Sequence, residues 1–397
     1  MNILFVNEIP FNPLYGGIER VTDILTKELI KNTSYKVFYL AARIDNKDIL
    51  SYDFPAPQFV LPYKGEFLNV QNVEYYSEFL INNSIDVVIN QRGWAPFMDN
   101  VLNIGTVKTI SAIHTIPLGA VTHKMRNYWK YEKDFIGIMR FLCKMLITPV
   151  FYFYKKKLYT DKLYIHYKDL VLRSSAVVLL SQKDKFDFDR IVSNVEKKCR
   201  TYTIANPNVL SQNIIDFKEK SHIILYVGRL SNSEKNPMRL LYIWEKLYSR
   251  HLDWTLCFVG DGGAKHEMMD YVVKNKIERV LFEGRSSNVE TYYKRASFIC
   301  LTSDFEGWGM TLTEGMGYGC IPFTFNNYGA AEDIIDDAKN GCLIPPYNLT
   351  LYSERLSELM NDENKRRAMA IAAHEKVQNF NVCNIIPKWI SLIEEII

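Results

Sequence analysis

Short apolar runs alternate with longer helical patterns along the whole chain, and this alternation limits the fold more than any other feature. The runs are rich in β-branched residues and bounded by polar ones, which is typical of buried parallel strands. The first series is NILFV (2–6), KVFYLA (36–41), DVVIN (86–90), TISAI (109–113) and AVVLLS (176–181). Between the first two runs, residues 18–32 place Val21, Leu25 and Leu29 on one helical face. The first half of the chain therefore has a β-α-β order.

A second series of the same kind fills the rest of the chain. It consists of HIILYVG (222–228), TLCFVG (255–260), RVLFEG (279–284), FICLTS (298–303) and CIPFTF (320–325). Two such series predict an α/β protein with two Rossmann-like, doubly wound domains that face each other across a central cleft. The length of 397 residues agrees, because a single core stops growing at about 250–300 residues.

The boundary between the two domains is predicted in the segment TIANPNVLSQN (203–213). Its Asn-Pro-Asn sequence interrupts any regular element. We therefore predict an N-terminal domain over 1–206, which the C-terminal helix 381–397 joins, and a C-terminal domain over 207–380.

Composition and charge exclude several classes of protein. An apolar fraction of 48% and a charged fraction of 23% are those of an ordinary globular protein, and a net charge of +3 is too small to indicate nucleic acid as a partner. The seven cysteines form no C-x-x-C pair, which favours small core residues in a reducing compartment. The N-terminal MNILFVNEIPF lacks a basic region and is expected to be a strand rather than a signal peptide. We therefore expect a cytoplasmic protein.

Basic charge is concentrated in residues 124–173. This segment carries twelve Lys or Arg against four Asp or Glu, a local net charge of +8. Arg140, Lys144 and Pro149 interrupt its apolar stretch before the ~20 residues that a membrane-spanning helix needs. Each Lys or Arg near anionic lipid contributes ~1 kcal/mol to binding. The segment therefore indicates contact with an anionic membrane surface, and a solvated pair of helices with a tyrosine-rich edge is the alternative.

The stretch DFEGWGMTLTEGMGYG (304–319) follows a predicted strand and places two carboxylates among five glycines. In open α/β sheets, ligands bind at the carboxyl ends of the strands. A helix that begins near Gly309 would point its unpaired backbone N–H groups at an anion. Glu306 precedes this helix and Glu314 lies one turn into it, so one carboxylate flanks each side of the anion. Because a carboxylate accepts hydrogen bonds from a vicinal diol, the pattern suits a nucleotide sugar.

A second candidate segment, VGRLSNSEKNP (227–237), also follows a predicted strand. Arg229 and Lys235 are placed to meet a diphosphate, since Arg binds phosphate through a planar fork. A surface Arg and Lys near a helix start is the alternative.

The first domain offers a glycine turn and one histidine. Gly16 and Gly17, in LYGGIERV (14–21), resemble a phosphate-cradling turn, but the dinucleotide pattern G-x-G-x-x-G is absent both here and in GDGGAK (260–265). His114 ends a predicted strand, and we expect it to project into the cleft; a hydrogen-bonded structural histidine is the alternative.

A metal site is not expected. Asp187 and Asp189 form a D-x-D pair, but they lie in KDKFDFDRIV, a charged helix start that is better explained as a solvated face. The chain also lacks a Gly-x-Ser-x-Gly elbow and a Walker-type loop.

These motifs together resemble a known family. EGWGMTLTEGMGYGCIP resembles the E-x7-E segment of the retaining family 4 glycosyltransferases of GT-B fold. GGIERV, SAIHT, VGRLSNSEKNP, FVGDG and GAAEDIIDDAKNGCLI occur in the family's order and spacing, so the resemblance covers most of the chain. The most similar members are bacterial enzymes that build lipopolysaccharide, capsule or exopolysaccharide.

The resemblance implies a role for each matching residue. Glu306 would contact the transferred sugar, Glu314 the ribose, and His114 the donor sugar, so His114 and Glu306 would act at the reacting centre. Arg229 and Lys235 would neutralise the diphosphate. Gly309, Met310 and Thr311 would donate backbone N–H groups to it, and Gly16 and Gly17 would close over it from the first domain. Two features depart from the family: the spacing from Arg229 to Lys235 is one residue longer than usual, and Asn236 replaces a glycine.

The implied reaction transfers a hexose from a nucleoside diphosphate, such as UDP-Gal, UDP-Glc or UDP-GlcNAc, to a hydroxyl of a lipid-linked or cell-surface glycan with retention of configuration. Positive groups already aimed at the leaving diphosphate would stabilise it without a metal or another cofactor. A nucleotide-sugar epimerase, a phosphorylase of related fold, or a non-catalytic nucleotide-sugar-binding subunit are the alternatives.

Overall fold

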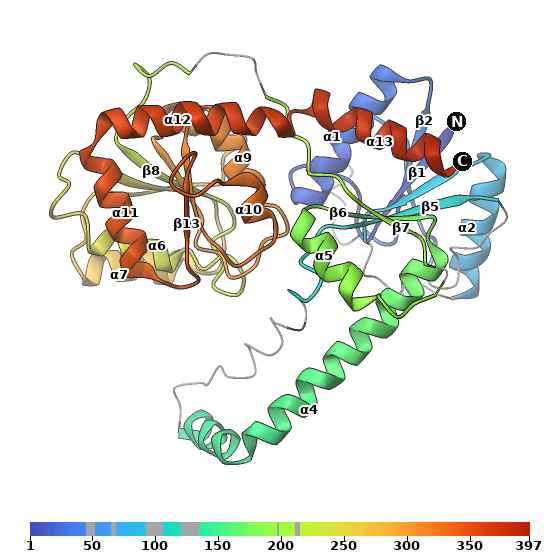
Figure 1. Ribbon diagram of the computed structural model, residues 1–397, viewed down its shortest axis with the longest axis horizontal. Coiled ribbons are helices and arrows are strands. Elements are labelled where there is room, and N and C mark those ends of the chain that lie inside the picture. Colours follow the sequence, from blue (N-terminus) through green and yellow to red (C-terminus); the bar gives the residue numbers. More distant parts are fainter. Residues whose placement is uncertain are drawn as a thin grey trace. The chain divides into compact units, whose positions relative to one another are not determined.

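The computed structural model describes residues 1–44, 52–64, 69–92, 106–119, 121, 135–196, 198–210 and 215–397, except for the side chains of 135–152. The chain forms two compact units, one of Met1–Ile204 with Trp389–Ile397 and one of Ala205–Lys388 (Figure 1). The predicted boundary at 206/207 lies two residues from this division. The C-terminal residues that join the first unit begin at Trp389 instead of residue 381.

The first unit is built on a parallel sheet with strand order β3-β2-β1-β4-β5-β6-β7. The order reverses between β1 and β4, which makes this pair the topological switch point of the sheet. The elements are β1 (Asn2–Asn7), α1 (Gly17–Asn32), β2 (Lys36–Ala41), β3 (Gln58–Val60), α2 (Val70–Asn82), β4 (Val87–Asn90), β5 (Lys108–Ile113), α4 (Phe135–Arg173), β6 (Ala176–Leu179), α5 (Gln182–Ile191) and β7 (Arg200–Thr203).

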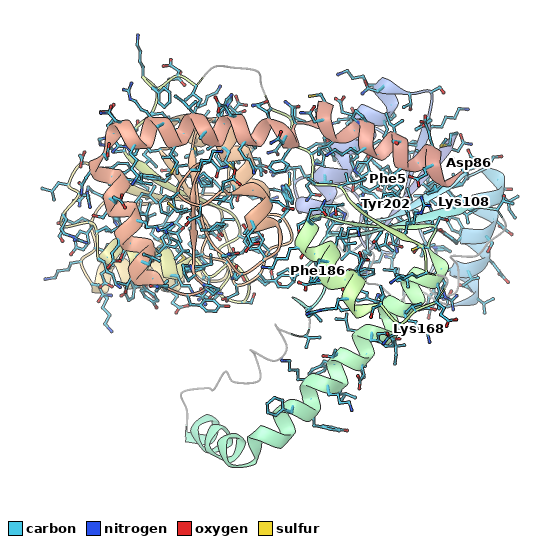
Figure 2. All side chains as sticks on the ribbon, in the orientation of Figure 1. Phe5, Asp86, Lys108, Lys168, Phe186 and Tyr202 are labelled. Atoms are coloured by element: carbon cyan, nitrogen blue, oxygen red, sulfur yellow. The ribbon has the colours of Figure 1, made fainter. Side chains whose placement is uncertain are left out.

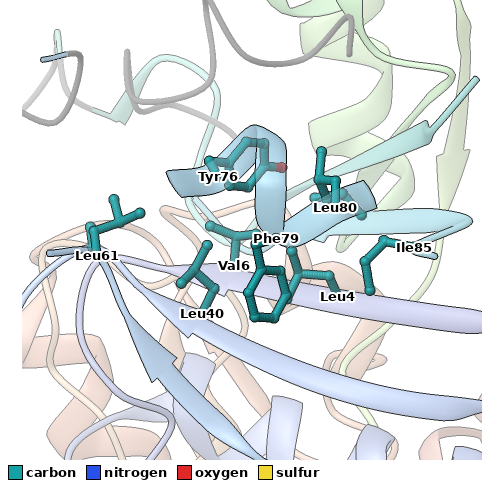
Figure 3. Close-up of a cluster of buried hydrophobic side chains, with 10 residues drawn as sticks. Leu4, Val6, Leu40, Leu61, Tyr76, Phe79, Leu80 and Ile85 are labelled. Carbon is teal, nitrogen blue, oxygen red and sulfur yellow. The ribbon is translucent and has the colours of Figure 1, made fainter. Parts of the chain in front are cut away.

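Helix α2 packs on one face of this sheet through a cluster of large apolar side chains (Figure 3). Phe79 and Leu80 of α2 meet Leu4, Val6 and Leu40 from the adjacent strands β1 and β2, and all five are almost fully buried. The alternating residues of the central strands thus supply a continuous apolar face, as expected for strands covered on both sides.

Helix α4 is one continuous helix, which differs from the pair of helices considered for residues 124–173. Its C-terminal part packs on the first unit, where Tyr167, Leu170 and Val171 contact a core that includes Val177 and Phe188. Residues 124–134 of the basic segment lie outside the described residues. No helix in the described ranges is long and apolar enough to cross a membrane.

The second unit contains a parallel sheet with strand order β10-β9-β8-β11-β12-β13, whose switch point lies between β8 and β11. Its elements are β8 (Ile223–Val227), α6 (Met238–Glu245), β9 (Thr255–Val259), α7 (Lys265–Lys274), β10 (Val280–Gly284), α8 (Glu290–Arg295), β11 (Phe298–Cys300), α9 (Met310–Gly317), β12 (Ile321–Phe325), α10 (Ala330–Ile334), β13 (Cys342–Ile344), α11 (Leu349–Asn361) and α12 (Glu363–Val377), with a 3-10 turn at Gln378–Phe380. Helix α13 (Val382–Ile396) begins in this unit, and its residues from Trp389 onward belong to the first unit. The predicted α/β architecture of two doubly wound sheets is confirmed.

Cysteines of the second sheet are small core residues, as predicted. Cys257, Cys300, Cys320 and Cys342 are buried, and the cysteines that the structure describes form no disulfide. Burial raises the pKa of the Cys342 thiol to about 12 and also raises the pKa of the other three thiols, which favours the protonated form over the thiolate.

Two loops approach each other closely at the carboxyl edge of this sheet, where β8 and β9 end. Gly260 has φ +147°, and a Cβ atom placed there would lie 1.9 Å from the carbonyl oxygen of Gly228. A side chain at this position would therefore push the two strand ends apart.

We expect Gly260→Ala to lower the free energy of unfolding by about 2 kcal/mol or more, because it combines backbone strain with a backbone clash. Urea unfolding, followed by the fluorescence of the tryptophans, measures this. Gly263→Ala is the matched control, since a Cβ there meets open space, and its effect should stay within ~0.5 kcal/mol. Equal midpoints for the two variants would contradict the close approach.

Candidate functional site

The predicted residues of the second unit gather at the switch point of its sheet. Arg229 and Lys235 follow β8, Glu306 follows β11, and α9 begins at Met310. Since β8 and β11 are neighbours at which the strand order reverses, the loops that follow them leave the sheet at its topological switch point. The sequence thus places both motifs at the position where open α/β sheets bind ligands.

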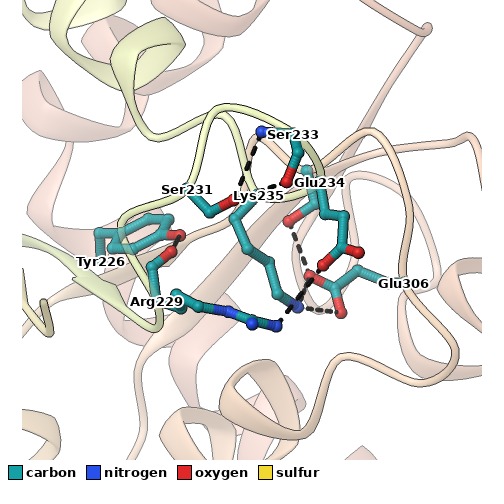
Figure 4. Close-up of polar contacts among 8 residues, drawn as sticks. Tyr226, Arg229, Ser231, Ser233, Glu234, Lys235 and Glu306 are labelled. Atoms are coloured by element: carbon teal, nitrogen blue, oxygen red, sulfur yellow. Dashed lines mark hydrogen bonds and ion pairs between the residues drawn. The ribbon is translucent and has the colours of Figure 1, made fainter. Parts of the chain in front are cut away.

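The central contact of this site is an ion pair between Lys235 and Glu306 (Figure 4). Lys235 Nζ donates to both carboxylate oxygens of Glu306 at 2.7 Å, and Ser303 Oγ donates to Glu306 Oε1 at 2.7 Å. The Glu306 side chain is 8% exposed and the Lys235 side chain 26%. An ammonium group has three N–H donors, so Lys235 can hold Glu306 and still donate to a bound anion.

Asp304 fixes the loop that carries Lys235 against the end of β11. Its carboxylate accepts a hydrogen bond from Arg239 Nη1 at 2.6 Å and another from Asn236 Nδ2. Its backbone N–H donates to the carbonyl of Glu234 at 2.8 Å, and Thr302 Oγ1 donates to the carbonyl of Asn236 at 2.9 Å. These contacts hold Lys235 in place from both sides of its loop.

The conformation of Asn236 explains why it can stand where the family commonly has glycine. Its φ is +43°, in the left-handed region that Gly favours and that Asn tolerates better than other residues. Lys235 is held by Glu306 even though its spacing from Arg229 is one residue longer than usual.

Helix α9 begins at the same edge, directly after Gly309, which has φ +86°. A Cβ at Gly309 would lie 3.1 Å from the hydroxyl of Tyr328, so the chain passes close to that residue. Burial raises the pKa of Tyr328, and the negative charge of Glu306 adds to this shift. Within the described chain no side chain caps α9, so its first-turn N–H groups, including those of Met310 and Thr311, can meet an anion.

Arg229 and Glu314 occupy the periphery of this site. The Arg229 side chain is 68% exposed and lies 3.5 Å from the carboxylate of Glu234, a pair so exposed that Arg229 can exchange it for another anion. Tyr226 Oη donates to the carbonyl of Arg229 at 3.1 Å and fixes its backbone. Glu314, on α9, accepts a hydrogen bond from Tyr293 Oη at 2.8 Å, which orients its carboxylate.

Several of these supporting residues were not found from the sequence. Asp304 directly follows the run FICLTS, so the rule that ligand sites lie at strand ends could have identified it. Ser303 gave the same signal. Tyr293 gave none, because it lies in an ordinary helical pattern of α8.

In the first unit, His114 directly follows β5 and contacts Gln91, which follows β4. The distance between His114 Nε2 and Gln91 Oε1 is 2.5 Å. Since Gln91 Oε1 only accepts, this contact assigns the proton to Nε2 and leaves Nδ1 as a buried acceptor without a partner in the described residues. Burial lowers the pKa of His114 to about 4, so the imidazole is neutral at neutral pH.

Gly16 and Gly17 lie at the start of α1, next to a buried carboxylate that the sequence reasoning did not identify. Glu19 accepts a hydrogen bond from Asn7 Nδ2 at 2.9 Å, and a Cβ on Gly16 would lie 2.4 Å from Glu19 Oε2. Burial raises the pKa of Glu19. A side chain at position 16 would therefore displace this carboxylate from its present position. The binding of a diphosphate by Gly16 and Gly17 stays a prediction.

The D-x-D pair lies on the solvated face of α5. Asp187 is 3.5 Å from Arg190, and Asp189 is 2.6 Å from Lys185 and accepts a hydrogen bond from Thr201 Oγ1. The side chains that the structure describes contain no group of three or more His, Cys, Asp or Glu placed to hold a metal ion.

The lowered pKa of His114 predicts how stability depends on pH. The unfolded chain binds a proton at His114 near pH 6.5, whereas the folded chain does so only near pH 4, so the free energy of unfolding falls as the pH decreases through this window. Between pH 6.5 and 4.5 the free energy of unfolding should decrease by on the order of 2 kcal/mol less in His114→Gln than in the parent protein. Urea unfolding of both proteins at the two pH values measures this, and an identical pH dependence would contradict the assignment.

Comparison with known proteins agrees with this arrangement. Residues 210–376 match the model of the family described as Glycosyl transferases group 1, so the second unit contains a domain of this kind. The chain is 30% identical over 225 residues to a Campylobacter jejuni enzyme named GalNAc-alpha-(1->4)-GalNAc-alpha-(1->3)-diNAcBac-PP-undecaprenol alpha-1,4-N-acetyl-D-galactosaminyltransferase, covering 56% of this chain and 60% of that protein. It is 30% identical over 221 residues to the amylovoran biosynthesis glycosyltransferase AmsD of Erwinia amylovora, covering 54% and 60%.

The match thus spans 60% of the length of these two relatives. Among solved structures, Anabaena Alr3699/HepE in complex with UDP and glucose is similar over 100% of both chains, with a TM-score of 0.73 at 16% identity. At this identity the likeness shows the fold alone, and the predicted GT-B fold is confirmed. The group 1 domain and the two named relatives support a glycosyltransferase with homologues in bacterial polysaccharide biosynthesis.

Proposed function

We propose that the protein is a retaining glycosyltransferase that moves a hexose from a nucleoside diphosphate sugar to a hydroxyl of a lipid-linked or cell-surface glycan. The observation that carries the proposal is the Lys235–Glu306 ion pair, held beside the uncapped N-terminus of α9 at the switch point between β8 and β11. A cation, the positive end of a helix dipole and a carboxylate thus lie at the same edge of the second sheet.

The diphosphate would bind where positive charge converges. Lys235 has an N–H beyond the two that contact Glu306, Arg229 is exposed at the same edge, and α9 contributes its first-turn N–H groups. These groups are fixed before the ligand arrives, so they stabilise the charge of the leaving diphosphate without reorganising. In this proposal they supply the neutralisation that a metal ion supplies at other diphosphate sites.

The sugars would bind to the carboxylates on either side of the diphosphate. Glu306 already accepts three hydrogen bonds, two from Lys235 and one from Ser303, which suits a group that orients sugar hydroxyls better than one that attacks carbon. Glu314, oriented by Tyr293, would accept from the ribose hydroxyls. His114 would accept a hydrogen bond from a sugar hydroxyl at Nδ1.

The bond changes follow from these roles. The bond between the anomeric carbon and the diphosphate oxygen breaks, and the acceptor oxygen bonds to the same face of that carbon. The leaving diphosphate takes the proton of the acceptor hydroxyl. Neither His114, which is neutral, nor Glu306, which is held in an ion pair, has to transfer a proton.

The relatives narrow the donor and the acceptor. The Campylobacter relative is named as an N-acetylgalactosaminyltransferase whose acceptor is an undecaprenol diphosphate glycan, and the Anabaena structure holds UDP and glucose. We propose a UDP-hexose donor, such as UDP-Gal, UDP-Glc or UDP-GlcNAc, because a structure of the same fold binds UDP and glucose. The name of the Campylobacter relative supports a lipid-linked acceptor for this chain. Such an acceptor would place the protein at the cytoplasmic face of a membrane.

The proposal is tested by incubating the full chain with a panel of UDP- and GDP-sugars and undecaprenyl diphosphate glycans while free nucleotide and the anomeric configuration of the product are measured. We expect one donor to release nucleotide in an acceptor-dependent manner with retention. Glu306→Gln and Arg229→Ala should each lower the rate by about 100-fold. Arg250→Ala is the control, because Arg250 is an exposed arginine before β9, at the opposite edge of the sheet.

The alternatives give different results in the same assay. A nucleotide-sugar epimerase would interconvert donors without releasing nucleotide, and a phosphorylase would require inorganic phosphate. Equal nucleotide release by Glu306→Gln, Arg229→Ala and the parent would show that the site is assigned wrongly.

A further inference from the structure

The C-terminal part of α4, residues 153–173, has two apolar faces. One face packs on the core of the first unit through Tyr167, Leu170 and Val171. The other face, which we call the outer stripe, consists of Tyr154, Leu158, Ile165 and Leu172, which are 61%, 39%, 65% and 47% exposed. Large apolar side chains that line one exposed face indicate an interaction surface.

The spacing of the outer stripe places its members together. They follow one another at intervals of four, seven and seven residues, and at about 100° per residue these positions fall within an arc of about 40°. The same geometry places Tyr167 and Leu170 on the opposite side of the helix. The outer stripe is therefore a second apolar face and not an extension of the one that packs on the core.

Positive charge flanks the outer stripe on both sides. Lys157 and Lys168 lie on one side of it and Lys162 on the other, as helical spacing requires (Figure 2, where Lys168 is labelled). Residues 153–173 contain six Lys or Arg and two Asp. Asp169 is 2.6 Å from Arg173, so its charge is compensated within the helix. Asp161 is exposed and lies between the outer stripe and Lys168 by the same spacing, so the surround holds one carboxylate among the lysines that no ion pair in the described part of the chain compensates. With six Lys or Arg against two Asp, residues 153–173 still carry a net positive charge beside the exposed apolar side chains.

The charges also decide between two occupants of this surface. The intervals of seven residues place Leu158, Ile165 and Leu172 at one core position of a coiled-coil heptad, but the other core position would hold Tyr154, Asp161 and Lys168. Two charged residues at that position disfavour a seam with a second copy of the chain. At a lipid surface, by contrast, the flanking lysines can extend to the headgroups, and a tyrosine side chain is favoured at the boundary between water and lipid.

We propose that the outer stripe docks onto an anionic lipid surface, with α4 lying along the membrane plane. The apolar side chains of the stripe would enter the boundary between headgroups and acyl chains, while Lys157, Lys162 and Lys168 contact lipid phosphates. This inference rests on the exposed face of α4 and does not depend on the proposed function.

The test is co-sedimentation of the full chain with vesicles of phosphatidylcholine alone and with vesicles containing 30% phosphatidylglycerol as probes. We expect binding only to the anionic vesicles, and weaker binding at high salt. The double variant Leu158→Ser/Ile165→Ser should lower the partition coefficient by roughly 100-fold, about tenfold for each side chain. Lys157→Gln/Lys162→Gln/Lys168→Gln should lower it and flatten the salt dependence.

The matched control is Leu252→Ser/Val273→Ser, which replaces two exposed apolar residues of the second unit and should leave binding unchanged. Circular dichroism shows that each variant is folded, and nucleotide release assayed without vesicles should be the same for all of them. Equal binding to neutral and anionic vesicles, or an undiminished partition of Leu158→Ser/Ile165→Ser, would overturn the proposal. So would a dimer in sedimentation velocity that this variant abolishes while vesicle binding persists.

Discussion

The ion pair between Lys235 and Glu306 is the interaction on which the rest of the candidate site depends. Two charges taken largely out of water each cost several kcal/mol, and a pair at this depth is tolerated only when further hydrogen bonds satisfy it. Here Ser303 donates a third hydrogen bond to the Glu306 carboxylate. Asp304 fixes the loop that carries the lysine by accepting hydrogen bonds from Arg239 and Asn236. The chain thus keeps a partly exposed ammonium group in one position beside the start of α9. That arrangement suits the binding of an anion better than it suits stability, since an apolar pair would hold the same loops together without the cost of desolvation.

The topology of the sheets explains why polar residues gather where they do. In both units the strand order reverses between two central strands, β1 and β4 in the first and β8 and β11 in the second, and the loops after these strands carry the charged residues. In the first unit, Glu8 follows β1 and contacts Arg92, which follows β4, at 2.9 Å. His114 and Gln91 lie at the same edge. The same constraint therefore produces a polar cluster in each unit. In each unit a helix whose start no described side chain caps, α1 in the first and α9 in the second, also follows a switch-point strand.

Much of the fold could be predicted from the sequence, because the central strands are buried on both faces and so appear as continuous apolar runs. The edge strands β3, β7 and β13 were missed. QFV and RTYT are short and partly exposed and lack that pattern, and CLI is only three residues long. The start of α9 was predicted from its glycines. Contacts such as Tyr293 with Glu314 and Gln91 with His114 were not, because they join residues that are 21 and 23 positions apart on different elements. The buried Glu19 was also missed, since a glutamate in the first turn of a helix usually indicates only a favourable helix dipole.

The central claim is that the ion-paired Lys235 also binds a diphosphate. Calorimetric titration of UDP into the full chain tests it most directly, with Lys235→Met compared with the parent and with the double variant Lys235→Met/Glu306→Gln, which removes the charge that the single variant leaves unpaired. The account predicts that both variants raise the Kd for UDP at least tenfold, since a charge-assisted hydrogen bond is worth about 1.5–3 kcal/mol, while the double variant regains the stability that the single one loses. A folded Lys235→Met protein that binds UDP as tightly as the parent would contradict it.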